Sequence, residues 1–169
     1  MIPAVLKNFS LFVDGKGYAG QVEEIVLPKL TRKMQEHRAG GMNGPVELDY
    51  GLEKLEASFT LSDYNKEVLS LFGAVDNAKV PLRFKGAVEQ DDEDGSVTAV
   101  EVVLNGRWRE LDMGSWKGGD KAVLKVGVAA SYYKYTQAGE DLIEIDVVNM
   151  IEKIGGVDRL AAQRAALGL

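Results

Sequence analysis

Alternation of apolar and polar positions is the dominant pattern of this chain, and it predicts β-strands. Residues 55–61 read LEASFTL, with every second side chain apolar. Successive side chains on a strand point to opposite faces, so this spacing places one face in a core and the other in water. Comparable alternation recurs, over longer or shorter runs, in residues 11–13, 22–27, 80–88, 98–108, 122–135 and 142–147.

Helix signals are restricted to two segments. Ser62 or Asp63 is expected to cap a helix over residues 65–72 that Gly73 closes, and Asp158 is expected to cap a second one over 159–167. The fold class is therefore mainly β: an antiparallel β-sandwich or barrel of about seven to eight strands with one packed internal α-helix and a short C-terminal helix. The length of 169 residues, without a compositional break, predicts a single domain, 1–169.

One segment fits neither class. Residues 37–45 lie between two strand-like runs and contain three glycines. The segment is too long for a hairpin turn, and loops of this kind often carry function or make contacts. A flexible excursion with no role is the alternative interpretation.

Composition narrows the function classes. Hydrophobic residues make up 46% and charged residues 27%, as in globular domains, and no apolar run approaches the roughly 20 residues of a membrane span, nor does the start read as a signal peptide. Cysteine is absent and His37 is the one histidine, which excludes disulfides, cysteine–zinc sites and histidine-rich metal sites. The net charge of −6 has the wrong sign for gripping nucleic acid or anionic membrane.

Two motifs resemble binding sites. Gly15, Gly17 and Gly20 spell G-x-G-x-x-G, but the following residues read as a strand ending in Pro28 rather than the helix a dinucleotide needs, so a hairpin is favoured. The acidic run 91–94 fits a calcium loop only if Gln90 takes the place of the first aspartate and if strands replace the flanking helices. A solvated hairpin tip is favoured there, and a calcium-binding module remains the alternative.

The sequence offers no set of residues with the spacing of a catalytic site. Glu36 and His37 are neighbours that would point to opposite faces of a strand, and Glu144 and Asp146 share a face without further partners. No nucleophile motif is present, so we expect no enzyme, no catalytic residue, no cofactor and no metal. Five aromatic residues could form a nucleic-acid platform, although core or interface packing is favoured: Trp108, Trp116, Tyr132, Tyr133 and Tyr135.

An ordered series of short segments gives a further indication, and it spans essentially the whole chain. The segments are MIP (1–3), NFSLFVDG (8–15), LPKL (27–30), RAGGM (38–42), PVELD (45–49), GLE (51–53), SYYK (131–134), EIDVVN (144–149), GVD (156–158) and LGL (167–169). Together they resemble the major tail tube proteins of contractile-tailed phages, the FII family, and the tube subunits of R-type pyocins. The acidic run 91–94 has no counterpart in this resemblance.

The resemblance implies a structural subunit of the inner tail tube of a contractile injection apparatus. Its copies would form hexameric rings that stack into a hollow conduit, either for phage DNA delivery into the host or for envelope puncture by a bacteriocin. Implied partners are the tail sheath, baseplate or initiator and tail terminator proteins, and a tape measure protein in the lumen. DNA would be passing cargo that is not bound, and no membrane anchoring is expected. The location would be the virion tail or bacteriocin particle, after assembly in the cytoplasm of the bacterial host.

The same resemblance suggests which residues make contacts. The helix near 63–72 would pack one face of the sandwich, the strands near 97–109 and 122–135 would carry part of the lumen wall, and a net-acidic bore would repel DNA. The assembly loop would consist of Arg38, Ala39, Gly40, Gly41, Met42, Asn43, Gly44 and Pro45. The alternative function is a small-molecule or calcium-binding β-barrel module.

Overall fold

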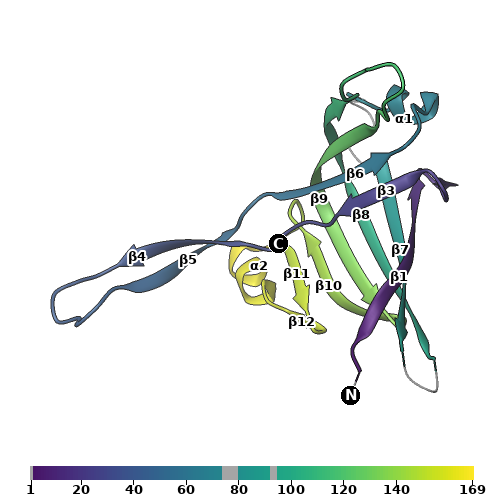
Figure 1. Ribbon diagram of the computed structural model, residues 1–169. Coiled ribbons are helices and arrows are strands. Elements are labelled where there is room, and N and C mark those ends of the chain that lie inside the picture. Colours follow the sequence, from purple (N-terminus) through teal and green to yellow (C-terminus); the bar gives the residue numbers. More distant parts are fainter. Residues whose placement is uncertain (1, 74–79, 92–94) are drawn as a thin grey trace.

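The computed structural model describes residues 2–73, 80–91 and 95–169 (Figure 1). Within these ranges the chain forms twelve strands and two short helices. Their bounds are β1 (Ala4–Val13), β2 (Lys16–Gly17), β3 (Val22–Val26), β4 (Arg32–His37), β5 (Val46–Leu52), β6 (Leu55–Leu61), α1 (Lys66–Ser70), β7 (Val80–Gln90), β8 (Val97–Asp112), β9 (Leu124–Gln137), β10 (Glu140–Asp146), β11 (Ile151–Ile154), β12 (Val157–Asp158) and α2 (Ala161–Leu167). No helix in the described part of the chain is long and apolar enough to cross a membrane.

The mainly β, antiparallel architecture with two helices is confirmed. Ten strands form one sheet in the order β12-β11-β10-β9-β8-β7-β1-β2, to which β6 and β3 are added beside β9, and β4 pairs only with β5. The strands are more numerous and more finely divided than the sequence pattern suggested. The first strand begins at Ala4, well before the alternating run at 11–13, because its exposed first half pairs with the far end of β7.

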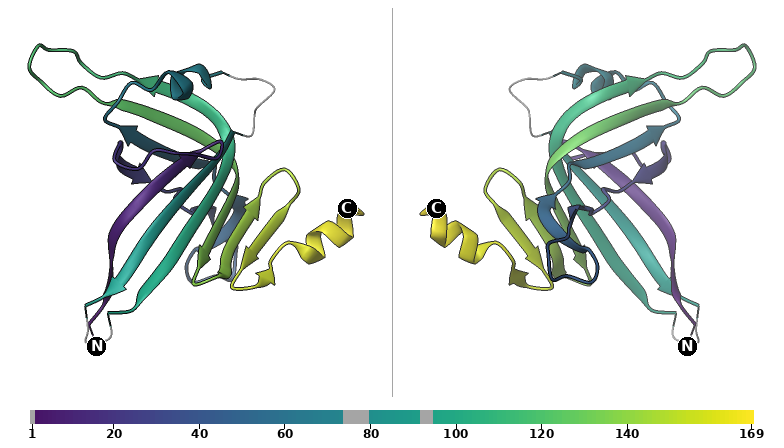
Figure 2. Two further views of the ribbon diagram at one scale, coloured as in Figure 1. Left: turned by 90° about the vertical axis from the view of Figure 1, so that its right-hand side faces the viewer. Right: turned by 90° about the vertical axis from the view of Figure 1, so that its left-hand side faces the viewer.

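The sheet branches at β9. The first half of this strand pairs with β6, from Leu124 opposite Leu61 to Ala130 opposite Leu55, and its second half pairs with β10. The partner changes at Ser131, where the β8–β9 register also shifts. As a result β6 and β3 turn over one end of the sheet, while β10, β11 and β12 continue the sheet at the other end (Figures 1 and 2).

The hydrophobic core lies under the part of the sheet that β6 and β3 cover. Strand alternation gives the sheet one apolar face, and neighbouring strands align their inward residues in rows such as Leu82, Leu104, Tyr133 and Ile145. Phe59 of β6 meets Trp108 of β8 edge to face, with ring centroids 5.7 Å apart. The predicted strand pattern of residues 55–61 is thus confirmed, because it alternates between buried and partly exposed along its whole length.

Both helices start later than expected. The cap of α1 is Asn65, whose side chain accepts hydrogen bonds from the backbone N–H groups of Glu67 and Val68, so the expected caps Ser62 and Asp63 lie outside the helix. In α2 the first helical residue is Ala161, and Asp158 accepts from the Leu160 N–H rather than from the helix itself. The predicted stop at Gly168 is confirmed by its left-handed conformation (φ 75°).

A long hairpin projects from the body of the molecule (Figure 1). We call it the arm: β4, the tip 38–45 and β5. Every residue of β4 and the first five of β5 are exposed, so the arm packs on little of its own chain. Its position is therefore set at its base.

An ion pair fixes that base. The guanidinium of Arg32, the first residue of β4, donates to the Glu152 carboxylate on β11, and its Nε lies 3.6 Å from Asp49 Oδ2 on β5. Glu152 faces the apolar side of the sheet opposite Ile145, and its side chain is only 7% exposed. The hydrogen bond to Glu152 raises the pKa of Arg32. A buried carboxylate on an apolar face requires such a partner, so the arm and the sheet are tied together here.

Replacing the cation should therefore destabilise the fold. We expect Arg32→Ala to lower the free energy of unfolding by about 2 kcal/mol, less than for a fully buried pair because Arg32 is itself 39% exposed. Urea unfolding followed by circular dichroism measures this change.

Two controls test whether the loss of stability comes from the buried Glu152 carboxylate rather than from the loss of any surface charge. Lys54→Ala removes an exposed partner of Glu56 and should leave the urea midpoint unchanged. The double variant Arg32→Met with Glu152→Leu should recover most of the loss, since a hydrophobic pair of similar volume replaces the ions. An Arg32→Ala protein as stable as the unmodified one would contradict the role given to this pair.

Candidate assembly surfaces

The predicted assembly loop forms the tip of the arm, remote from the core (Figure 1). It is held by two local contacts: the Met42 N–H donates to the Ala39 carbonyl at 3.2 Å, and the Ala39 N–H donates to the Met42 sulfur at 3.3 Å. Gly41 adopts φ 86°, which favours glycine. The tip is thus closed by a turn between Ala39 and Met42 at the end of a projecting hairpin.

Two glycines of the tip are not required by the backbone conformation or the packing of a single chain. A Cβ added at Gly40 or Gly44 would meet nothing within 4 Å, and neither residue has a positive φ. Within one molecule both positions would accept a side chain. The proposed contact role of residues 38–45 stays a prediction at this point.

The arm has two unlike faces. In β5, Val46, Leu48 and Tyr50 alternate and therefore share one face, where they are 46%, 42% and 59% exposed. The opposite face carries Glu47, directly across from Glu36. The first face is apolar only along β5, because Gln35 and His37 of β4 lie directly opposite Leu48 and Val46. The second face is acidic.

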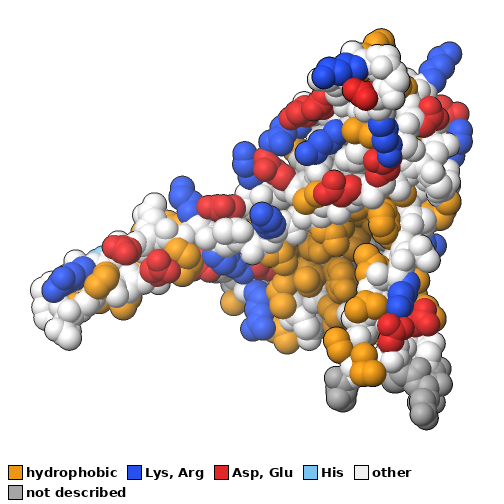
Figure 3. Space-filling view, in the orientation of Figure 1, with side chains coloured by type: hydrophobic (Ala, Val, Ile, Leu, Met, Phe, Trp, Pro, Cys, Tyr) orange, Lys and Arg blue, Asp and Glu red, His pale blue; other side chains and the backbone are white. Residues whose placement is uncertain are grey.

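A second uncovered apolar surface lies on the sheet. Beyond the edge of β3, the apolar face of β1, β7, β8 and β9 forms a groove of about 310 Å³. The space-filling view shows it as a hollowed hydrophobic area in the middle of the molecule (Figure 3). We call it the groove and refer to it by six lining residues: Leu6, Phe9, Leu27, Val88, Val100 and Tyr135.

The opposite face of the sheet is polar and carries charges in cross-strand rows. One row runs through Lys85, Glu101, Thr136 and Asp141, and the next through Arg83, Val103, Lys134, Glu144 and Lys153. Cations and carboxylates alternate along and between the rows: Arg83 Nε lies 3.2 Å from Glu101 Oε1, and Lys134 Nζ lies 3.4 Å from Asp141 Oδ2. The face is hydrophilic without a single dominant sign.

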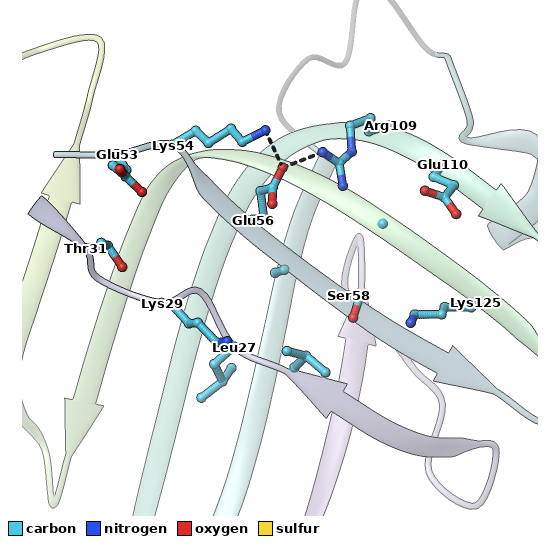
Figure 4. Close-up of a pocket in the computed structure, with 13 residues that line it drawn as sticks. Leu27, Lys29, Thr31, Glu53, Lys54, Glu56, Ser58, Arg109, Glu110 and Lys125 are labelled. Atoms are coloured by element: carbon cyan, nitrogen blue, oxygen red, sulfur yellow. Dashed lines mark hydrogen bonds and ion pairs between the residues drawn. The ribbon is translucent and has the colours of Figure 1, made fainter. Parts of the chain in front are cut away.

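A larger groove, of about 430 Å³, lies where the β3–β4 connection passes β6, β8 and β9 (Figure 4). Glu56 lies among its charged side chains, 3.1 Å from Lys54 Nζ and in contact with Arg109. The hydrogen bond from Lys54, followed by the charge of Arg109, lowers the pKa of Glu56. A carboxylate held ionised by two cations is an ion-pair cluster, not a proton donor near neutral pH.

The nucleotide-like glycines form a hairpin, as predicted. Phe12 pairs with Gly17 and Val13 with Lys16, and the turn between them is Asp14-Gly15, both with positive φ. Strand β3 follows, so no helix N-terminus stands at the glycines.

The other residues considered as metal-binding or catalytic sites do not come together in the structure. Residues 92–94 of the acidic run lie outside the described residues, and Asp91 pairs with Lys7 at 2.9 Å. The described residues contain no group of three or more His, Asp or Glu able to hold a metal. His37 is exposed at the end of β4, opposite Val46. Glu144 and Asp146 do share a face, where the Tyr132 hydroxyl donates to Glu144 at 3.4 Å.

The five aromatic residues do not form one platform. Trp108 and Tyr133 are buried in the core, as favoured from the sequence. Burial first, and Glu144 second, raises the pKa of Tyr132 to about 12. Trp116 is 72% exposed, and its ring N–H donates to the Tyr64 hydroxyl at 3.0 Å.

Sequence reasoning missed the Arg32–Glu152 pair and the groove, since no local motif marks either.

Comparison with known proteins identifies relatives of the whole chain. A family model described as "Phage tail tube protein FII" matches residues 3–168. The chain is 40% identical over 171 residues to the tail tube protein of Escherichia phage P2, covering 99% of both chains. It is 35% identical over 174 residues to the major tail tube protein of Serratia phage KSP20, covering 99% of this chain and 98% of that one.

Solved structures show the same fold at low identity. The PVC sheath/tube terminator of an extracellular contractile injection system gives a TM-score of 0.62 at 11% identity, covering 80% of this chain and 98% of that chain. The tube-terminating cap of the anti-feeding prophage gives 0.61 at 12% identity, covering 82% and 93%. With its whole length matched by the family and by two phage proteins, the chain belongs to the phage tail tube protein FII family and is a structural, non-enzymatic subunit of a contractile tail tube.

Proposed function

We propose that copies of this chain, each one tail tube domain spanning 1–169, form hexameric rings that stack into a hollow tube. One observation supports the ring: the described residues present two different unpartnered apolar surfaces, which are the row Val46, Leu48 and Tyr50 on the arm and the groove. Unlike surfaces on identical subunits join head to tail, and such an interface gives a ring when its rotation closes and a filament when it does not. The tip residues 38–45 contact the neighbouring subunit.

The polar face of β7, β8, β9 and β10 lines the bore. A sheet with one apolar and one polar face turns the polar one to water, and a hollow tube holds water in its channel. This places residues of β8 and β9 on the lumen wall, within the strands that the family resemblance suggests. The apolar face then points toward neighbouring subunits.

The tube passes DNA without holding it. Affinity for DNA comes mainly from cations that neutralise phosphates. In the rows described above, the four cations Arg83, Lys85, Lys134 and Lys153 stand among three carboxylates. Arg83 and Lys134 already form ion pairs with two of them, so a phosphate would compete with these pairs. The expected net-acidic bore thus becomes, along these two rows, a bore of nearly balanced charge in which two of the four cations are already paired.

The tube works as the inner part of a contractile tail. Its partners are the sheath protein outside it, the baseplate or initiator and tail terminator proteins at its ends, and a tape measure protein in the lumen. The sheath/tube terminator and terminating-cap structures share this fold, which supports end proteins built like the tube itself. Rings assemble in the bacterial cytoplasm for a phage virion, or for a bacteriocin particle that carries no genome.

The arm tip provides a direct test of assembly. Replacing residues 39–44 by an Asn-Gly turn shortens the hairpin without touching the core or the Arg32–Glu152 pair, so the melting temperature should stay unchanged. Negative-stain microscopy should show tubes for the unmodified protein and none for this variant. A shortened protein that still forms tubes would remove residues 38–45 from the assembly contact.

The bore face can be tested by changing its charge balance. Glu101→Lys removes the partner of Arg83 and adds positive charge to the proposed bore. Tubes of this variant should retain a short DNA duplex in co-sedimentation at low salt and release it at high salt, whereas unmodified tubes should retain none.

Asp120→Lys makes the same charge change in the loop between β8 and β9 and serves as the control. Its tubes should behave like unmodified tubes. Equal DNA retention by the two variants would mean that residue 101 does not face the bore.

A further inference from the structure

We propose that Asn43-Gly44, at the tip of the arm, is a site of spontaneous deamidation in the unassembled subunit, and that the deamidated chain is excluded from the tube (Figure 1). The exclusion rests on the proposed function, because it needs the tip to contact a neighbouring subunit, whereas the chemistry at Asn43 does not. Deamidation uses water and the protein's own backbone. The age of a free subunit then limits its use in assembly.

The reaction joins a backbone nitrogen to the side chain that precedes it. The Gly44 nitrogen loses its proton to base and attacks Cγ of Asn43, so the N–Cγ bond forms, the Cγ–Nδ2 bond breaks, and ammonia leaves with a proton in place of the one removed. Water then opens the succinimide ring. Opening at the side-chain carbonyl gives aspartate, and opening at the backbone carbonyl gives isoaspartate. A glycine after asparagine favours the attack, because no Cβ hinders the approaching nitrogen.

The two reacting groups are unrestrained within the described part of the chain. Asn43 is exposed, and no described residue forms a hydrogen bond with its side chain or accepts one from the Gly44 N–H. The contacts that close the tip join Ala39 and Met42 and end one residue before Asn43. A Cβ added at Gly44 would meet nothing within 4 Å. The Gly44 nitrogen can therefore approach the Asn43 side chain without breaking a contact of the tip.

The same dipeptide occurs once more in the sequence, in a setting that prevents the reaction. Asn105 and Gly106 lie in the middle of β8, where Asn105 is paired with Pro81 on one side and with Tyr132 on the other. Gly106 is buried, and a Cβ added there would collide with the Ala129 carbonyl. Ring closure at this position requires the sheet to open locally. The structure thus predicts very different rates for two identical dipeptides.

Deamidation changes the tip in two ways that oppose assembly. Arg38 is the one charged residue of the tip 38–45, so a carboxylate at position 43 cancels the net charge of the tip. Isoaspartate also lengthens the main chain by one methylene between Met42 and Gly44. A carboxylate placed in a protein contact loses its hydration and needs a cation opposite it. A contact that fits the neutral amide of Asn43 is therefore weakened by either product.

Assembly should in turn protect the site. In the proposed tube the tip lies against a neighbouring subunit, which limits both the motion of Gly44 and the access of base and water to it. Free subunits thus age at residue 43, whereas assembled subunits keep the Asn43 amide.

Peptide mass spectrometry of the unmodified protein tests the site. Dilute, unassembled subunits kept in heavy-oxygen water at mildly alkaline pH should incorporate the label at residue 43, faster as the pH rises, while residue 105 of the same molecules stays an amide. Preformed tubes should incorporate the label at residue 43 several-fold more slowly. Equal labelling of residues 43 and 105 in free subunits would overturn the proposed site, and equal rates in tubes and free subunits would overturn its protection.

Partition of aged protein tests the exclusion. Subunits aged until part of the population has deamidated are allowed to assemble and are then sedimented, and the deamidated chains should be enriched several-fold in the supernatant over the tubes. Equal deamidated fractions in pellet and supernatant would overturn the exclusion.

Two variants give matched controls. Asn43→Asp should reproduce the loss of tubes without ageing. Asn43→Gln keeps a neutral amide and would have to close a larger ring, so its subunits should still form tubes after the same ageing; a loss equal to that of the unmodified protein would place the cause of ageing elsewhere. A protein that forms no tubes at any age would refute the proposed function itself, while the labelling of residue 43 would still decide the chemistry.

Discussion

The structure depends on a mismatch between a long apolar sheet face and the short cover that the chain provides for it. Strands β3 and β6 bury one end of this face, around Phe59 and Trp108, and leave the other end open at Leu6 and Phe9. Uncovered apolar area of this kind is unfavourable in water in proportion to its size. A single subunit is therefore an incomplete core, and the proposed ring is the state in which the core is completed.

The branch of the sheet at β9 produces this mismatch. On one side of β9 the partner changes from β6 to β10 at Ser131, so the strands on that side divide into two groups. The exchange frees β10 and β11 to carry Glu152, which in turn holds Arg32 and the arm. The groove and the base of the arm thus lie on either side of this change of strand partner.

Much of the fold was predictable from local pattern, and the assembly surfaces were not. Alternation in 55–61 and 98–108 is strong because those strands have one buried face. The β4 sequence RKMQEH shows no such pattern, since all six of its residues are exposed and only pairing with β5 makes it a strand. The α1 cap was placed too early because Ser62, Asp63 and Asn65 are all good caps, and only the chain path selects Asn65. The Glu152 partnership joins residues 120 positions apart, which no local motif reveals.

In the proposed tube, neighbouring subunits complete the apolar face while the polar face lines the bore. The most direct measurement is a helical reconstruction by electron cryomicroscopy of tubes assembled from the unmodified protein. We predict hexameric rings in which Val46, Leu48 and Tyr50 of one subunit lie in the groove of the next, with Glu101 and Lys134 facing the channel. A tube whose grooves are empty, or whose channel is lined by Leu6 and Phe9, would contradict the account.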